Sequence, residues 1–131
     1  MKKRRKHDEK ENIISFCSMM MVFTVVTPVF GSEVPLISAS NNSPYKENFK
    51  NKWHHTIEKN GGRHYLYYAY DTSLVKEDVA YADSKGYRHR SKIVNARGTF
   101  YGPKKWANQG RSDQEVRHKG ATVKYYCNVF K

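Results

Sequence analysis

The clearest pattern in the chain is an alternation of apolar and polar positions close to its C-terminal end. Over residues 121–130, Ala, Val, Tyr, Cys and Val occupy every second position, and Thr, Lys, Tyr, Asn and Phe lie between them. A period of two residues is typical of a β-strand with one buried face. The pattern therefore predicts a strand whose core side is formed by Ala121, Val123, Tyr125, Cys127 and Val129.

Further upstream, short runs of aromatic and β-branched residues lie between turn-forming residues. They predict strands at Arg63–Tyr70, Tyr87–Ala96 and Thr99–Tyr101. The run Val79–Ala82 is compatible with a short strand or a helical turn, and residues 108–119 are expected to form a polar loop. No stripe of apolar residues at helical spacing follows the N-terminal apolar run. Together these runs predict an all-β fold, a small antiparallel β-sandwich of about five to six short strands.

The N-terminal residues form a targeting pattern. Residues 2–6 are all Lys or Arg, and an apolar run extends over residues 13–30. This order is typical of a secretory signal peptide, and it predicts cleavage between Gly31 and Ser32 and secretion of the remaining chain. An uncleaved membrane anchor is the alternative, because the run approaches the ~20 residues that a membrane span needs.

Cleavage at that position divides the chain into three parts. Residues 1–31 are the signal peptide, residues 32–50 are expected to form a flexible leader rich in Ser and Asn, and residues 51–131 form the β domain. A pro-segment is the alternative role for residues 32–50. A second possible cleavage site follows Ala39 or Ser40.

The net charge indicates which partners the secreted chain would attract. The sequence has 24 Lys and Arg against 12 Asp and Glu. Six of the basic and three of the acidic residues lie within residues 1–31, so the mature chain keeps a formal charge of +9. Such a chain attracts anionic lipids, wall polymers, nucleic acids or pyrophosphate groups. An extracellular location disfavours nucleic acid among these partners.

The cysteines exclude an internal disulfide in the mature chain. Cys17 leaves with the signal peptide, so Cys127 remains without a second cysteine to pair with. Stability must then come from a packed core, a partner subunit or both. Because Cys127 lies on the predicted core side, it is expected to be a buried apolar residue, with an intermolecular bridge as the alternative.

Histidines and sequence motifs give little support for catalysis or metal binding. Adjacent His54 and His55 would point to opposite faces of a strand, and no cysteines are spaced as zinc ligands. Signatures of serine hydrolases, P-loops and kinases are absent. We therefore expect no enzymatic activity, no catalytic residue, no metal and no cofactor. A small basic nuclease that uses His89, His118 and Lys92 around one phosphate is the enzymatic alternative.

Basic residues mixed with aromatic ones are the strongest candidates for a binding surface. They surround Tyr87, Phe100 and Tyr101 in the sequence. Such a mixture suits an anionic, partly apolar ligand at a membrane, with a solvated basic sheet face as the alternative. Trp106 is expected to be a core residue, with a ligand contact as its alternative. The candidate set comprises Arg88, Arg90, Lys92, Arg97, Lys104, Lys105 and Trp106.

Several segments of the chain resemble the lactococcin 972 family of bacteriocins. They are HRSKIVN (His89–Asn95), KKWANQGR (Lys104–Arg111) and GATVKYYCNVF (Gly120–Phe130), and GGRHYLYYAY (Gly61–Tyr70) resembles the opening strand of the family. The family usually has Trp soon after the Gly pair, where this chain has Arg-His. A cysteine also interrupts the terminal motif.

The resemblance implies a secreted, unmodified β-sandwich protein that associates as a dimer and acts without enzymatic activity. It further implies inhibition of related Gram-positive bacteria through lipid II, with interference in cell-wall and septum synthesis. Membrane immunity and transport proteins of the producing cell are the other partners that it implies. A secreted wall-polymer- or surface-binding module without killing activity is the first alternative, and the small basic nuclease is the second.

Overall fold

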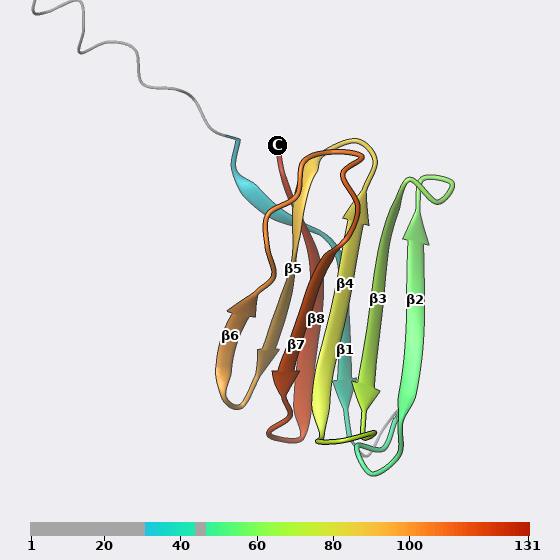
Figure 1. Ribbon diagram of the computed structural model, residues 1–131, viewed down its shortest axis with the longest axis vertical. Coiled ribbons are helices and arrows are strands. Elements are labelled where there is room, and N and C mark those ends of the chain that lie inside the picture. Colours follow the sequence, from blue (N-terminus) through green and yellow to red (C-terminus); the bar gives the residue numbers. More distant parts are fainter. Residues whose placement is uncertain (1–30, 44–46) are drawn as a thin grey trace, which may run out of the picture. The chain divides into compact units, whose positions relative to one another are not determined.

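Every regular element in the described part of the protein is a β-strand. The computed structural model describes residues 31–43 and 47–131, and residues 1–30 of the predicted signal peptide lie outside it. No helix in this part is long and apolar enough to cross a membrane. The strands (Figure 1) are β1 (Glu33–Asn42), β2 (Trp53–Lys59), β3 (His64–Asp71), β4 (Glu77–Ser84), β5 (Arg88–Asn95), β6 (Gly98–Tyr101), β7 (Ser112–Arg117) and β8 (Thr122–Phe130).

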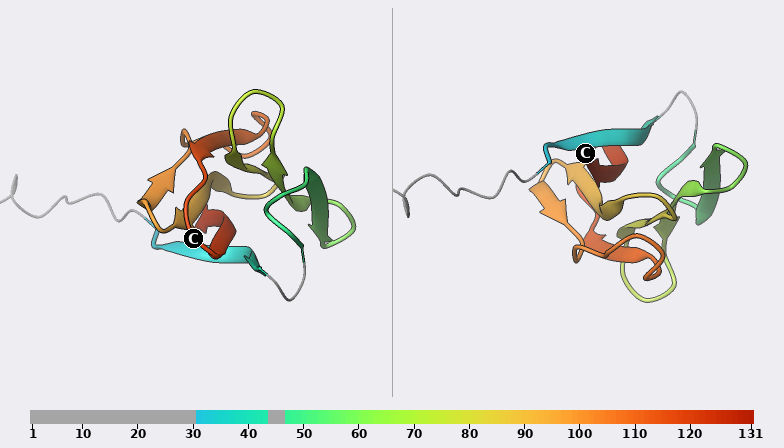
Figure 2. Two further views of the ribbon diagram at one scale, coloured as in Figure 1. Left: turned by 90° about the horizontal axis from the view of Figure 1, so that it is seen from below. Right: turned by 90° about the horizontal axis from the view of Figure 1, so that it is seen from above.

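These strands form two four-stranded sheets in which every neighbouring pair is antiparallel. Sheet A has the order β1-β8-β5-β6, and sheet B has the order β2-β3-β4-β7. The views along the strands show the two layers, with β6 and β2 at opposite ends (Figure 2). The predicted all-β antiparallel sandwich is confirmed. The expected number of about five to six strands is wrong, because β1 and β7 lie in segments expected to be a flexible leader and a polar loop.

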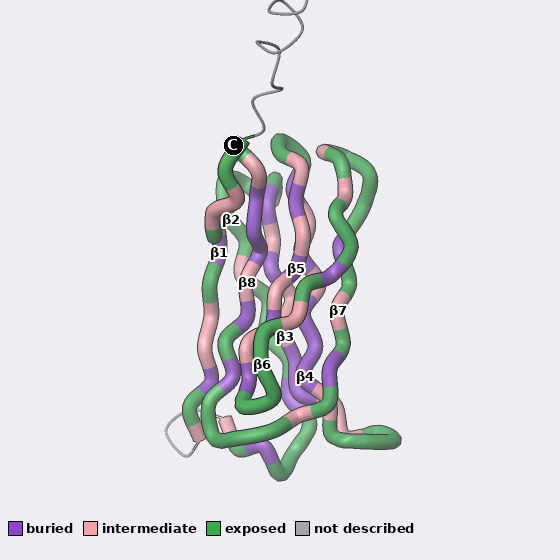
Figure 3. The backbone as a smooth tube through the Cα atoms, turned by 90° about the vertical axis from the view of Figure 1, so that its left-hand side faces the viewer, coloured by how far each residue is buried: buried purple, intermediate pink, exposed green. Residues whose placement is uncertain are grey.

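The core lies between the sheets, and buried positions alternate with exposed ones along the strands (Figure 3). On β8, the predicted core side is confirmed for its four positions from Val123 to Val129, which are fully buried. Ala121 is exposed because it precedes the strand. Cys127 is a buried apolar residue as expected, and burial raises the pKa of its thiol to about 12. Sheet B packs against this side with Trp53, Leu66, Tyr70, Ala80, Ala82 and Val116.

Strand β1 shows that residues 32–50 are not simply a flexible leader. This strand pairs with β8, and its Ile37 side chain is only 1% exposed. The pairing register shifts between Pro35 and Ile37, so Val34 and Ile37 both pack against the core although three positions separate them. The shift breaks the two-residue period, and for that reason the alternation is hidden in the sequence.

Strand β7 corrects the prediction of a polar loop over residues 108–119. It pairs with β4 along its whole length, and its Ser112 and Val116 side chains are buried. Of these two buried residues only Val116 is apolar, so the sequence of the segment shows no alternation of apolar and polar residues. The run Val79–Ala82, compatible with a strand or a helical turn, belongs to strand β4.

A buried polar contact joins β5 of sheet A to β4 of sheet B. Asn95 Nδ2 donates to Asp78 Oδ2 at 2.9 Å and to the Arg117 carbonyl oxygen at 3.0 Å. His118 Nδ1 lies 2.8 Å from the other oxygen of Asp78, Oδ1. Burial raises the pKa of the Asp78 carboxyl, whereas the hydrogen bonds from Asn95 and His118 act in the opposite direction.

Toward the other end of β5, the imidazole of His89 is fully buried. Its Nδ1 lies 2.9 Å from the Tyr87 carbonyl oxygen, and its Nε2 lies 2.8 Å from the Gly110 carbonyl oxygen. Both ring nitrogens therefore lie within hydrogen-bond distance of backbone carbonyl oxygens. Asp83 Oδ1, on β4 of sheet B, lies 3.4 Å from Nε2. Polar contacts therefore hold β5 against β4 toward both of its ends.

Replacing Asn95 by alanine should destabilise the fold. The change removes the donor shared by Asp78 and Arg117 and leaves a buried carboxylate oxygen without that partner, which costs about 2–3 kcal/mol of unfolding free energy. Urea unfolding measures the loss, and Asn42→Ala, at an exposed position of β1, should stay within about 0.5 kcal/mol of the wild type. An unchanged urea midpoint for Asn95→Ala would show that the contact does not stabilise the sandwich.

Candidate functional site

The outer face of sheet A gathers most of the basic residues that the sequence singles out. On β5, buried side chains alternate with those of Arg88, Arg90 and Lys92, which therefore point away from the core. Strand β8 lies beside β5 and places Phe130 opposite Arg88 and Tyr126 opposite Lys92. Long cationic side chains and aromatic rings thus stand next to each other across the strands.

The cationic groups of this face lie over the aromatic rings. The guanidinium carbon of Arg90 is 3.9 Å from the ring centre of Tyr101, which β6 contributes. The guanidinium of Arg88 lies 4.6 Å from the Trp106 ring, and Lys92 Nζ lies 5.6 Å from that of Tyr101. Such contacts contribute about 0.5–1 kcal/mol each at exposed sites. They hold the charges beside an apolar surface.

The segment after β6 returns to the same face. The backbone of Lys105 pairs with that of His89, at 2.8 and 2.9 Å, which directs the two neighbours of Lys105 to the outer side. Lys104 Nζ lies 5.1 Å from the Phe130 ring centre, and Trp106 is 60% exposed. The expectation that Trp106 is a core residue is therefore wrong, because the backbone bridge at Lys105 turns the indole outward.

Two of the predicted binding residues do not join this group. Arg97 is exposed at the turn between β5 and β6, where its backbone N–H donates to Asn95 Oδ1 at 2.8 Å. Lys105 is half-buried on the strand side opposite to its neighbours. Among the aromatic residues, Phe100 pairs with Ile93 and packs against the core. The structure brings the other predicted residues together.

Sequence reasoning missed the part of this surface that β8 supplies. Lys124, Tyr126 and Phe130 occupy the positions between the buried ones, and Lys92 Nζ lies 5.0 Å from the Tyr126 ring centre. The signal was present as the second half of the alternation over residues 122–130. The surface is termed the basic face and comprises Arg88, Arg90, Lys92, Tyr101, Lys104, Trp106, Lys124, Tyr126 and Phe130.

A carboxylate from β1 borders the basic face. Glu33 Oε1 and Oε2 accept hydrogen bonds from Nε and Nη2 of Arg90, each at 2.6 Å, and Oε1 also accepts one from Asn128 Nδ2 at 3.0 Å. The forked bond with Arg90 lowers the pKa of the Glu33 carboxyl. Part of the segment expected to be a flexible leader therefore positions a charge of the candidate site.

The residues of the alternative nuclease site do not come together. His89 and His118 contact Asp83 and Asp78, which are five positions apart on β4, so roughly 16 Å of strand separates the two contacts. Lys92 points to the outer face of sheet A. Within the described part of the chain, no three metal-ligating side chains form a group that could hold a metal ion.

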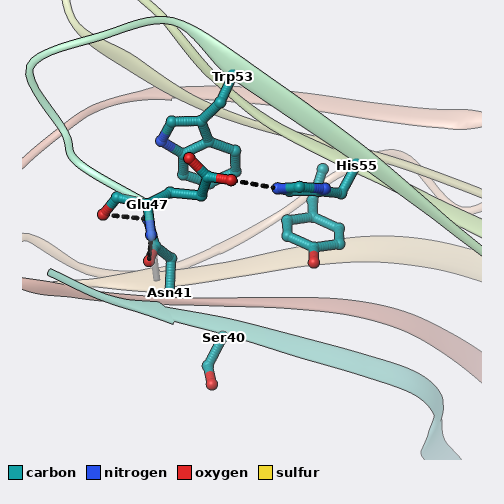
Figure 4. A pocket seen from close by; sticks show the side chains of 6 residues that line it. Ser40, Asn41, Glu47, Trp53 and His55 are labelled. Atoms are coloured by element: carbon teal, nitrogen blue, oxygen red, sulfur yellow. Dashed lines mark hydrogen bonds and ion pairs between the residues drawn. The ribbon is translucent and has the colours of Figure 1, made fainter. Parts of the chain in front are cut away.

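A pocket of about 220 Å³ lies between the edge strands β1 and β2 (Figure 4). Glu47 Oε1 lies 3.1 Å from His55 Nε2, and the Asn41 side chain bonds to the Glu47 backbone at 3.2 and 3.4 Å. These contacts tie Glu47 to both edge strands. The remaining lining residues are Ser40, Trp53 and Tyr68.

Comparison with known proteins identifies no relative of this chain. No family model, curated protein or solved structure matches the chain.

The ion pair between Glu33 and Arg90 predicts a dependence of stability on pH. Because folding lowers the pKa of Glu33, its contribution is present above the ordinary value of 4.5 and is lost as the pH falls through the folded-state pKa. Glu33→Gln should lower the unfolding free energy by about 1 kcal/mol at pH 7 and by clearly less at an acidic pH below the folded-state pKa. Thermal unfolding at both pH values checks this, with the exposed Glu58→Gln as control. A constant difference between wild type and Glu33→Gln would contradict it.

Proposed function

We propose that this protein is a secreted bacteriocin that binds lipid II and thereby interferes, without enzymatic activity, with cell-wall and septum synthesis in related Gram-positive bacteria. The observation that carries the proposal is the basic face of sheet A. A secreted chain that gathers cations and exposed aromatic rings on one sheet face suits a ligand with a charged head and an apolar chain. The motif resemblance supports the same activity.

The chemistry of the basic face matches the two parts of such a ligand. Arg88, Lys92 and Lys104 supply cations for the pyrophosphate, and a guanidinium can bond two phosphate oxygens at once. The exposed rings of Tyr101 and Trp106 can lie at the membrane surface, where amphipathic aromatic side chains are favoured. Anionic lipids of the membrane would add about 1 kcal/mol of attraction per nearby Lys or Arg.

The remaining parts of the proposal follow from the sequence. The signal-peptide pattern would deliver the chain to the cell exterior, where lipid II is accessible. The motif resemblance implies a dimer in solution and membrane immunity and transport proteins in the producing cell. These partners remain predictions.

Removing two cations of the basic face should weaken the binding of lipid II. In Lys92→Ala/Lys104→Ala, the affinity for vesicles that contain lipid II should fall roughly 10- to 30-fold, since two surface lysines are lost. Growth inhibition of a sensitive strain should fall in parallel. The control Lys50→Ala/Lys76→Ala changes the net charge equally at exposed positions outside the basic face and should act like the wild type.

Three results of that experiment would decide against the proposal in different ways. Equal affinities of the two double variants would show that the basic face is not the site. No binding of lipid II and no growth inhibition by the wild type would remove the proposed activity. Binding to purified wall polymers without growth inhibition would favour the wall-polymer-binding alternative.

Glu33→Gln should have the opposite effect on ligand binding. It releases Arg90 from its forked ion pair and removes a negative charge beside the basic face. We expect roughly twofold tighter binding to lipid II vesicles at pH 7, measured by the same titration. Weaker binding would show that Glu33 contributes by orienting Arg90 rather than by opposing the ligand.

A further inference from the structure

The outer face of sheet B differs from the basic face in charge. Its outward positions on β2 and β7 include Glu58, Asp113 and Glu115. Arg111 precedes β7 beside them and already forms an ion pair with Asp113, with Nε 2.8 Å from Oδ1. The two outer faces of the sandwich therefore offer different chemistry to a ligand.

A groove of about 410 Å³ crosses this face. Three residues that lie side by side across neighbouring strands form one side of the groove. They are Thr56 on β2, Tyr67 on β3 and Tyr81 on β4. The other side follows the next row along β2 and β3, where Glu58 lies opposite Tyr65. Thr56 is small and exposed, and it leaves room beside the large tyrosines. Arg111 completes the lining.

The tyrosine rings stack on one another along the first row. Tyr67 and Tyr81 have ring centres 5.1 Å apart and planes inclined by 14°, and the Arg111 guanidinium lies 4.2 Å from the Tyr81 ring centre. Tyr81 also donates its hydroxyl hydrogen to Glu115 at 2.8 Å. Burial and this acceptor raise the pKa of Tyr81 to about 12. At pH 7 Tyr81 therefore presents a neutral phenol group beside the groove.

The charges of the groove disfavour an anion, and the guanidinium of Arg111 covers the Tyr81 ring that a cation would seek. An anion would meet the carboxylate of Glu58 and those of Asp113 and Glu115 nearby, and the one cation of the lining, Arg111, is already paired. A cation that sought the Tyr81 ring would meet the guanidinium of Arg111 over it. A neutral ligand with many hydroxyl groups avoids both penalties.

We propose that this groove binds an uncharged oligosaccharide. The apolar C–H faces of the sugar rings would contact the tyrosines, and the hydroxyl groups of the sugar would bond to Thr56, Glu58 and Arg111. Carboxylate and guanidinium groups can each bond two neighbouring hydroxyls. The inference stands apart from lipid II binding, because it concerns the opposite sheet and a different ligand chemistry.

Calorimetric titration of the full chain with chitotetraose, cellotetraose and maltotetraose tests the proposal. At least one tetrasaccharide should bind with a Kd of about 1 mM or tighter. Tyr67→Ala should weaken that binding about tenfold, and the conservative Glu58→Gln at an exposed position should weaken it about threefold. Tyr126→Ala removes a tyrosine from the basic face instead and should leave the affinity within about twofold.

The proposal is overturned if none of the three sugars binds, or if binding is equal in Glu58→Gln, Tyr67→Ala and wild type. Choline and inorganic pyrophosphate, titrated in parallel, test the ionic alternatives. Binding of either one that Tyr67→Ala abolishes, without sugar binding, would also overturn it. Lipid II binding is measured with basic-face variants, so failure of one proposal leaves the other intact.

Discussion

The buried carboxylate of Asp78 is the constraint on which the arrangement of the two sheets depends. A charged group without exposed surface is costly unless polar partners compensate it. Here the partners come from two other elements, Asn95 on β5 and His118 after β7. The sheets must therefore meet in a register that brings these side chains to Asp78. The burial of apolar side chains between the sheets contributes more free energy in total than the polar contacts of Asp78. Because the hydrophobic effect is not directional, it adds stability without selecting that register.

The same contact determines what the protein presents to the outside. Once Asn95 and His89 face inward, the two-residue period of β5 sends Arg88, Arg90 and Lys92 outward. Side chains alternate in the same way on β4 of the other sheet, where the outward positions include tyrosine and acidic residues. A chain with a strong net positive charge therefore sorts its charges onto two faces of different chemistry.

Strand β1 links the predicted maturation of the chain to its fold. Cleavage between Gly31 and Ser32 would leave the whole strand in place, including Glu33 beside the basic face and Ile37 in the core. Cleavage after residue 39 or 40 would remove both and leave one edge of β8 without its partner. The fold is therefore compatible with the earlier cleavage site and would be damaged by the later one.

Taken alone, the sequence determined those strands whose apolar and polar residues alternate visibly along the chain. The period of two in β8, including the burial of Cys127, follows from an extended backbone, and the basic residues of β5 follow from the same rule. Only the tertiary structure decided that β1 and β7 are strands, because distant partners supply their hydrogen bonds and a register shift or polar composition hides their period. It also decided that Trp106 is exposed and that Lys104 meets Phe130, since the backbone bridge between Lys105 and His89 joins segments that no local pattern connects.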